Sequence, residues 1–305
     1  MDRQLRVYTK RRLKPGRFEN FFSKLSITNW IILINVIVYL LMFLFIGILG
    51  AEKTFLFFAL QPTAFFFGYV WTLLSSMFMH SPSNIGHLLF NMLSLFFVGN
   101  FVEKIIGRKR FLWFYLISGI FAGFFHAALT YFFGVPFILS ESLKIGSLNW
   151  FRFGVFGSPE VFSVGASGAI FGLLGLLAVL IPNKKIYLIA GPLLAIVVQA
   201  MLSSIFPGAA FLEPLNLLII IYFFVSIFSI FSLNPTMRKI SLPLGMPLWL
   251  LPIVAIVPLV VIGLFVLLPI GNMAHLGGLL VGLAYGNHLR KKYPKKARHL
   301  SRTLT

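Results

Sequence analysis

The sequence contains no cysteine and only 7 acidic residues among its 305 positions, and Asp2 is the only aspartate. The lack of cysteine excludes a disulfide framework, thiolate metal sites and a cysteine nucleophile. An aspartyl intramembrane protease, which needs two aspartates inside the membrane, is excluded by the position of Asp2. A zinc metalloprotease is excluded because no His-Glu-x-x-His run is present. Any enzyme chemistry in this chain must therefore work almost without carboxylates.

Charged residues of either sign are also scarce. They make up 11% of the chain, against roughly 25% in an ordinary soluble domain, while hydrophobic residues make up 59%. The mean hydropathy is +0.94. Such a chain cannot cover a globule with polar surface, so we expect an integral multi-pass membrane protein. The net charge is +19, and its meaning depends on where the basic residues lie.

The basic residues gather at both ends of the chain and between long uncharged segments. A spanning helix needs about 20 apolar residues, and Lys and Arg accumulate on the cytoplasmic side of a membrane. Placing both termini in the cytoplasm leaves only Lys53, Lys144 and Arg152 on the outside. The uncharged segments then resolve into about eight expected spans, at 29–50, 84–103, 111–133, 164–182, 187–206, 211–233, 247–268 and 272–289.

The predicted fold is therefore an all-α, polytopic membrane helix bundle. Residues 1–28 form a basic cytoplasmic N-terminal segment, 29–289 the transmembrane domain and 290–305 a basic cytoplasmic tail. The basic residues flank spans and no nucleic-acid-binding fold is visible, so nucleic acid is not an expected partner. Contact of the basic ends with anionic lipid headgroups of the bilayer is expected instead.

The segment 51–83 has an unusual composition for an external connection. It is rich in phenylalanine, with Tyr69 and Trp71, and Pro62 and Pro82 interrupt it. Broken apolar sequence with many aromatic residues is typical of a segment that lies in the membrane interface. The alternative, an additional spanning helix, disagrees with the parity that the basic residues impose.

Polar side chains inside apolar spans indicate function, and four of them fall at one depth. Ser167 lies near the outer end of the fourth expected span and His275 near the outer end of the last. His87 and Asn91, at positions i and i+4, share one face of the second span. At a rise of 1.5 Å per residue, Ser167, His87 and His275 each lie about 5–8 Å below the outer boundary.

These residue types together predict acyl-transfer chemistry. A serine hydroxyl is a weak nucleophile that needs an adjacent base, and neutral histidine is the usual one. The oxyanion of the transition state needs preorganised donors, which His87, Asn91 and the backbone N–H of Ser167 could supply. The external carboxylates (Glu141, Glu160 and Glu213) have no motif around them. We therefore expect a Ser167–His275 dyad without an orienting carboxylate.

Small residues follow both members of the expected dyad at a spacing that lets membrane helices approach closely. They are Gly168, Gly172 and Gly175 after Ser167, and Gly278, Gly282 and Gly286 after His275. Phe171, one turn below Ser167, is placed to stack on the His275 ring. We expect His126 to be a satisfied interior residue. The remaining histidines (His80, His288 and His299) are expected to be solvated or interfacial.

At these positions the chain resembles the rhomboid intramembrane serine proteases. The matching stretches are His87-Leu-Leu-Phe-Asn91, Gly165-Ala-Ser167-Gly168 and Ala274-His275-Leu-Gly-Gly278, in the order of that family. The resemblance implies that Ser167 is the nucleophile and His275 the general base. It also implies that His87 and Asn91 line the oxyanion hole and that 51–83 is a membrane-embedded first loop.

The chain departs from the family in two places. The rhomboid-like core has six helices with one helix between the serine and histidine helices, whereas this chain has room for three. Residues 184–240 are therefore interpreted as an inserted helical hairpin that supplies two extra helices, and 243–268 as the usual intervening helix. The Trp-Arg pair of the family's first loop is Trp71-Thr72 here, which weakens the expected anchoring of that loop.

The functional hypothesis is an intramembrane serine endopeptidase in the plasma membrane, with its site open to the extracytoplasmic side. It would cleave a transmembrane or membrane-proximal peptide bond of membrane-protein substrates, without a metal or an organic cofactor. One alternative is a catalytically inactive, rhomboid-like scaffold that binds transmembrane helices. A transporter is a weaker alternative, because no carboxylate lies deep within an expected span, and Glu103 and Glu213 stand only at span ends. The oligomeric state and the natural substrate do not follow from the sequence.

Overall fold

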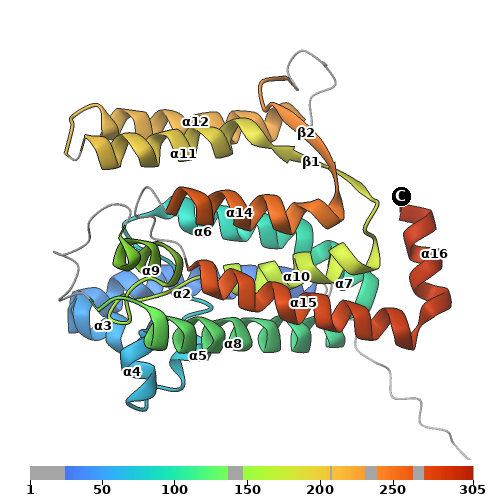
Figure 1. Cartoon of the computed structure of the whole chain (residues 1–305), viewed down its shortest axis with the longest axis horizontal. Coiled ribbons are helices and arrows are strands. Elements are labelled where there is room, and N and C mark those ends of the chain that lie inside the picture. Colours follow the sequence, from blue (N-terminus) through green and yellow to red (C-terminus); the bar gives the residue numbers. More distant parts are fainter. Residues whose placement is uncertain (1–24, 137–146, 207, 231–238, 264–270, 305) are drawn as a thin grey trace, which may run out of the picture.

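The computed structural model describes residues 25–136, 147–206, 208–230, 239–263 and 271–304. Most of these residues are helical, and the long helices lie side by side as a polytopic membrane bundle (Figure 1). Several expected features lie outside the described residues, namely the N-terminal basic segment up to residue 24, Glu141, Lys144, and the span ends at 231–233 and 264–268.

Three helices of the described part are long and apolar enough to cross a membrane by length and composition. They are α2 (Ile27–Leu49), the continuous helix Ile85–Ile106 and α8 (Arg108–Phe133). The second consists of α6 (Ile85–Ser94), the π-helical turn η1 (Leu95–Gly99) and α7 (Asn100–Ile106). The first three predicted spans are confirmed to within a few residues at each end.

A buried carboxylate joins the first two of these helices. Glu103 in α7 is only 6% exposed and accepts hydrogen bonds from the backbone N–H of Ile27 at 2.9 Å and of Thr28 at 2.8 Å. The Thr28 hydroxyl donates to the same carboxylate at 2.8 Å. The first N–H groups of a helix have no partner within it, and a carboxylate also suits the positive end of the helix dipole. Glu103 therefore caps α2 from a neighbouring helix.

The remaining membrane helices follow in the predicted order. They are α10 (Ser167–Leu180), α11 (Ala190–Ile205), α12 (Leu212–Ile230), α14 (Leu251–Gly263) and α15 (Asn272–Lys292). Three of these starting points differ from the prediction by three or four residues: α10 begins at residue 167 rather than 164, α11 at 190 rather than 187 and α14 at 251 rather than 247. The first difference places Ser167 at the N-terminus of its helix instead of within it.

The helices α10 and α15 form the centre of the bundle, side by side in Figure 1. Their backbones touch: a Cβ atom on Gly278 would overlap the carbonyl oxygen of Gly168, and one on Gly282 would overlap that of Gly172. Contacting residue numbers rise together along both helices, so the helices run parallel. Only positions without a side chain permit this approach, and it fixes the outer turn of one helix against that of the other.

A short β-ribbon lies outside the all-helical prediction. Strand β1 (Lys185–Ile189) pairs with β2 (Pro243–Pro247) in antiparallel register, from Lys185 opposite Pro247 to Ile189 opposite Pro243. The residues of β1 are largely β-branched or aromatic, which suits a strand. An apolar run of this length cannot be told from the start of a helix by its composition, so the prediction assigned part of it to a span.

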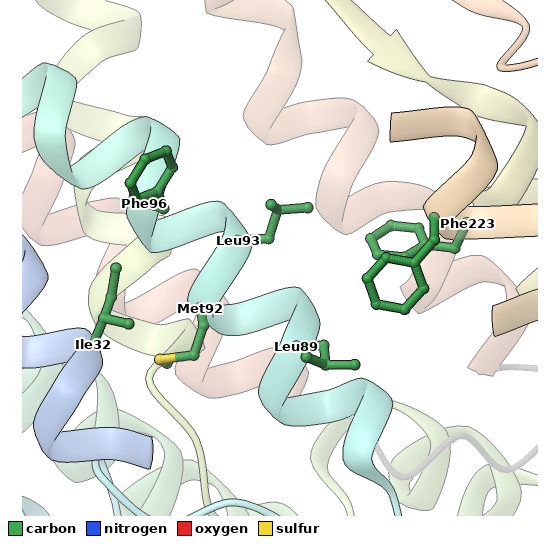
Figure 2. Close-up of a pocket in the computed structure, with 7 residues that line it drawn as sticks. Ile32, Leu89, Met92, Leu93, Phe96 and Phe223 are labelled. Atoms are coloured by element: carbon green, nitrogen blue, oxygen red, sulfur yellow. The ribbon is translucent and has the colours of Figure 1, made fainter. Parts of the chain in front are cut away.

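The ribbon leads into the hairpin formed by α11 and α12, which Figure 1 draws apart from the central helices and above α14 and α6. The Phe223 ring of α12 lies 4.0 Å, centroid to centroid, from the Phe90 ring of α6. Between the hairpin, α6 and α2 lies an apolar groove of about 240 Å³ (Figure 2). It is lined by Ile32, Leu89, Met92, Leu93, Phe96, Phe223 and Phe224.

The segment between the first two spans folds into three short helices, α3 (Ala51–Phe58), α4 (Pro62–Phe66) and α5 (Thr72–Ser75). An isolated β-bridge joins Leu60 of this segment to Ser163, just before α10. The expected external loop 134–162 contains a helix that was not predicted, α9 (Leu148–Phe156). Arg152 fastens α9 to the end of α8 by donating to the carbonyl oxygens of Phe133 at 2.9 Å and Gly134 at 3.1 Å.

The basic tail is also helical in this structure. Helix α16 (Pro294–Leu304) follows α15 and crosses the end of the bundle at a steep angle to the other helices (Figure 1). Leu300 packs against the main hydrophobic core, whereas Lys295, Lys296 and Arg298 are exposed. The prediction did not assign a helix here because so short and basic a segment lacks an apolar run.

Candidate active site

Ser167 and His275 meet at one end of the α10–α15 pair. The Nε2 atom of His275 lies 2.9 Å from the Oγ atom of Ser167, although 108 positions separate the two residues in the sequence. His275 is buried and Ser167 is half-buried. His275 is the fourth residue of α15, and the contact of Gly278 with Gly168 lies one turn further along α15 and directly after Ser167 in α10.

Ser167 opens α10, which leaves its backbone N–H without an intrahelical acceptor. The first main-chain hydrogen bond of this turn runs from the N–H of Ile170 to the carbonyl oxygen of Ala166 at 3.1 Å. Helix N-termini present free N–H groups and a positive dipole end to an anion. The start of α10 therefore offers a donor directly beside the serine hydroxyl.

The His275 ring is held by stacking rather than by a carboxylate. The Phe171 ring lies parallel to it, with centroids 4.2 Å apart and an interplanar angle of 14°. Among the described residues, no group forms a hydrogen bond with the buried Nδ1 atom of His275. A neutral imidazole with its proton on Nδ1 keeps a lone pair on Nε2, the atom that faces Ser167.

His87 and Asn91 lie close to the backbone just before Ser167. A Cβ atom on Gly165 would lie 2.9 Å from Nε2 of His87 and 3.9 Å from Nδ2 of Asn91. Gly165 has a φ of +126°, a conformation that L-residues with side chains rarely adopt. Asn91 donates one N–H to the carbonyl oxygen of His87 at 2.8 Å, and its second N–H is not used in that bond.

The expectation that His80 is solvated or interfacial is wrong. His80 is fully buried, and its ring centroid lies 5.1 Å from that of His87. Burial, with a smaller contribution from His87, lowers the pKa of His80 to about 3, and a backbone interaction with Phe78 opposes this only in part. The chain turns at Pro82 and Ser83, between the two histidines, and proline is a residue type that favours such a turn.

His126 is a satisfied interior residue, as expected. Its Nε2 atom lies 2.8 Å from the Ser163 hydroxyl and its Nδ1 atom 3.2 Å from the Thr130 hydroxyl. Ser163 was not among the predicted site residues, because it lies outside the Gly165–Gly168 motif and no other pattern in the sequence indicates a function for it.

The segment 51–83 is anchored in this structure although Thr72 replaces the arginine of the family's Trp-Arg pair. The Trp71 indole N–H donates to the carbonyl oxygen of Phe57 at 2.8 Å, and its ring contacts those of Phe57 and Tyr69. The hydroxyl of the buried Thr72 donates to the carbonyl oxygen of Tyr69 at 2.5 Å. These bonds close the segment on itself at the position where an arginine was expected.

Comparison with known proteins gives consistent matches. The model of the rhomboid domain matches residues 67–216. The chain is 32% identical over 185 residues to the rhomboid protease GluP of Bacillus subtilis (strain 168) and 32% identical over 149 residues to the rhomboid protease AarA of Providencia stuartii. The chain belongs to the rhomboid family.

The matches cover only part of this chain, part of each relative and part of the candidate site. The GluP alignment covers 60% of this chain and 30% of that relative, and the AarA alignment covers 48% and 51%. The chain thus matches about a third to half of the length of these relatives. The rhomboid domain match includes His87, Asn91 and Ser167 but ends before His275. Within the described residues, no group of three His, Cys, Asp or Glu side chains could hold a metal ion.

Proposed function

We propose that this rhomboid-family chain is an intramembrane serine endopeptidase that hydrolyses a peptide bond in or near a transmembrane segment of another membrane protein. The observation that carries the proposal is the 2.9 Å contact between Ser167 Oγ and His275 Nε2 at the start of α10. The relatives named rhomboid proteases support the same class of activity.

In the proposed reaction, Ser167 Oγ attacks the scissile carbonyl carbon while His275 Nε2 takes the hydroxyl proton. The oxyanion then lies near the free N–H of Ser167, with His87 and Asn91 as further donors. His275 returns its proton to the leaving amine, and an acyl-enzyme remains. A water molecule, deprotonated by His275, hydrolyses that ester and restores Ser167.

The supporting residues hold this geometry. Phe171 keeps the His275 imidazole in plane against α10, and Gly278 permits the approach of the two helices. Gly168 gives the space next to Ser167, because a Cβ atom there would lie 2.7 Å from Cβ of Ala122. Gly165 does the same beside His87.

The substrate helix must unwind locally before it can react, since its backbone is otherwise hydrogen-bonded internally. We propose the plasma membrane as the location, with both termini cytoplasmic and the site open to the extracytoplasmic side. The basic residues support this orientation, because the tail helix α16 and the adjoining ends of α7 and α8 are both rich in Lys and Arg.

The test is cleavage of a model transmembrane substrate in proteoliposomes, together with labelling by a fluorophosphonate probe that reacts with activated serines. Wild type should cleave and become labelled, and Ser167→Ala should do neither. The His275→Asn variant should lose at least about 10³-fold in rate, because the proton acceptor is gone. A folded wild type that neither cleaves nor labels would instead favour a scaffold that binds transmembrane helices.

A further inference from the structure

A second serine–histidine pair lies next to the proposed dyad. His126 of α8 is buried, and its Nε2 atom lies 2.8 Å from Oγ of Ser163, four residues before Ser167. Its Nδ1 atom lies 3.2 Å from Oγ1 of Thr130, which in turn bonds to the carbonyl oxygen of Phe156 at 2.7 Å. The four groups form one chain of hydrogen bonds from α8 to the segment that precedes α10.

The direction of every bond in this chain follows from donor chemistry. The Phe156 carbonyl oxygen can only accept, so the single hydroxyl proton of Thr130 goes to it. The Thr130 oxygen must then accept from an N–H on Nδ1 of His126. A neutral His126 has no proton left for Nε2, so Nε2 accepts from the Ser163 hydroxyl. Each of the three side chains thus donates and accepts at defined atoms. A hydrophobic residue at any of these positions would break the chain of hydrogen bonds.

This chain of hydrogen bonds, called the relay below, ends at Ser163. The backbone of Ser163 is itself hydrogen-bonded to another segment. Ser163 exchanges two main-chain hydrogen bonds with Leu60, at 2.7 and 3.1 Å. Two residues further on, the N–H of Gly165 donates to the carbonyl oxygen of Ser76 at 2.9 Å. Two residues span at most about 7 Å, so a displacement of Ser163 is passed to Gly165, which lies against His87.

We infer that His126, together with Thr130 and Ser163, is a positioning residue for the reaction proposed above. The inference rests on that proposed function and adds a role that the dyad does not contain. The relay holds residues 163–166 in register with α8, so that the N–H of Ser167 and the His87 ring keep their relative places. It acts through Gly165 and Ser167, because its own serine is bound on both backbone groups and on its hydroxyl.

Thr130→Val is the sharpest perturbation, since it keeps the shape of a fully buried side chain and removes both bonds of the hydroxyl. Thr130→Ser restores the hydroxyl and is the conservative variant. Thr28→Val is the matched control, because Thr28 is equally buried and donates to Glu103, far along the chain from the relay. Thermal unfolding in detergent, kcat and KM for a transmembrane substrate, and the labelling rate of Ser167 are measured for all three.

We expect Thr130→Val to lower kcat and the labelling rate by roughly tenfold, the equivalent of one buried hydrogen bond, with KM within about twofold of wild type. Thr130→Ser should recover most of this loss. Thr28→Val should lower the melting temperature to a similar extent but leave kcat unchanged. Ser163→Ala, a smaller side chain that is easily accommodated, should repeat the loss of kcat if Thr130→Val does not fold.

Two results would overturn the inference while leaving the proposed function intact. One is a wild-type kcat in folded Thr130→Val and Ser163→Ala, and the other is an equal loss of kcat in Thr28→Val, which would mark a general effect of lower stability. A folded wild type without cleavage or labelling would instead refute the proposed function, and the positioning role with it.

Discussion

The contact between α10 and α15 makes a quantitative prediction about Gly278→Ala. The added methyl group would occupy the space of the Gly168 carbonyl oxygen, and the Gly172 nitrogen lies only 3.3 Å from the same position. Both neighbours are backbone atoms, so no side chain can rotate away. The two helices must therefore separate by about 1 Å or more at this turn.

This separation acts directly on the dyad, because Gly278 lies one turn below His275 and Gly168 is adjacent to Ser167. A misplacement of about 1 Å in reacting groups can cost roughly 100-fold in rate. Overpacking of a rigid contact costs about 1–3 kcal/mol of stability. We therefore expect Gly278→Ala to lose roughly 100-fold in both the labelling rate of Ser167 and substrate cleavage, with a lower melting temperature.

The assay compares this variant with two glycine-to-alanine changes elsewhere. Gly47→Ala in α2 has no atom within 4 Å of the new methyl group, so its labelling rate should match wild type. Gly286→Ala meets the Val179 side chain at 2.8 Å, two turns further from the dyad, so it should lower stability more than activity. A Gly278→Ala protein that labels as fast as Gly47→Ala would refute the claim that this contact sets the Ser167–His275 distance.

Three further changes test other parts of the structure. Gly165→Ala should lower Ser167 labelling at least tenfold, because it combines an unfavourable φ with a contact of 2.9 Å to His87; wild-type labelling would contradict this. Glu103→Gln should lower the free energy of unfolding by about 1–3 kcal/mol and leave labelling at the wild-type rate in the folded fraction; an unchanged melting temperature would show that this cap is dispensable. Because the pKa of His80 falls to about 3 on folding, the unfolded chain binds the extra proton between that value and about pH 6.5, the ordinary value for histidine. Stability should therefore decline on acidification through this window, by up to about 1.4 kcal/mol per pH unit. His80→Phe should flatten the dependence of melting temperature on pH between 7.5 and 4.5, and an unchanged slope would contradict the burial of His80.

The spans were predictable because membrane helices follow two physical rules, an apolar length of about 20 residues and an accumulation of Lys and Arg on the cytoplasmic side. Apolar length fixed α2, α6 to α7 and α8, and the scarcity of carboxylates left Ser167 and His275 as the chemistry to look for. Their contact depends on backbone approach between glycines, which small-residue spacing indicates directly. The number and order of the expected helices followed from apolar length together with the placement of Lys and Arg.

The parts that were missed depend on contacts between distant segments. No sequence motif includes Ser163, and its proposed role follows only from the short distance between its hydroxyl and the His126 ring. His80 is buried by the fold of the 51–83 segment rather than by any apolar run of its own. The cap of α2 by Glu103 joins residues that are 75 positions apart, and no local pattern specifies such a pair. Helix periodicity carries no information about these tertiary hydrogen bonds.

The β-ribbon explains how two additional helices fit between α10 and α14 without disturbing the proposed site. Lys185, just after α10, pairs with Pro247, just before α14, so the chain re-enters the bundle beside the point where it left. A hairpin of two helices also preserves the direction of α14. Since the cost of closing a loop rises only slowly with its length, the ribbon lets the hairpin vary while its two ends stay fixed. Ser167 and His275 are then positioned by the α10–α15 contact and by α8, and none of these helices belongs to the ribbon or to the hairpin.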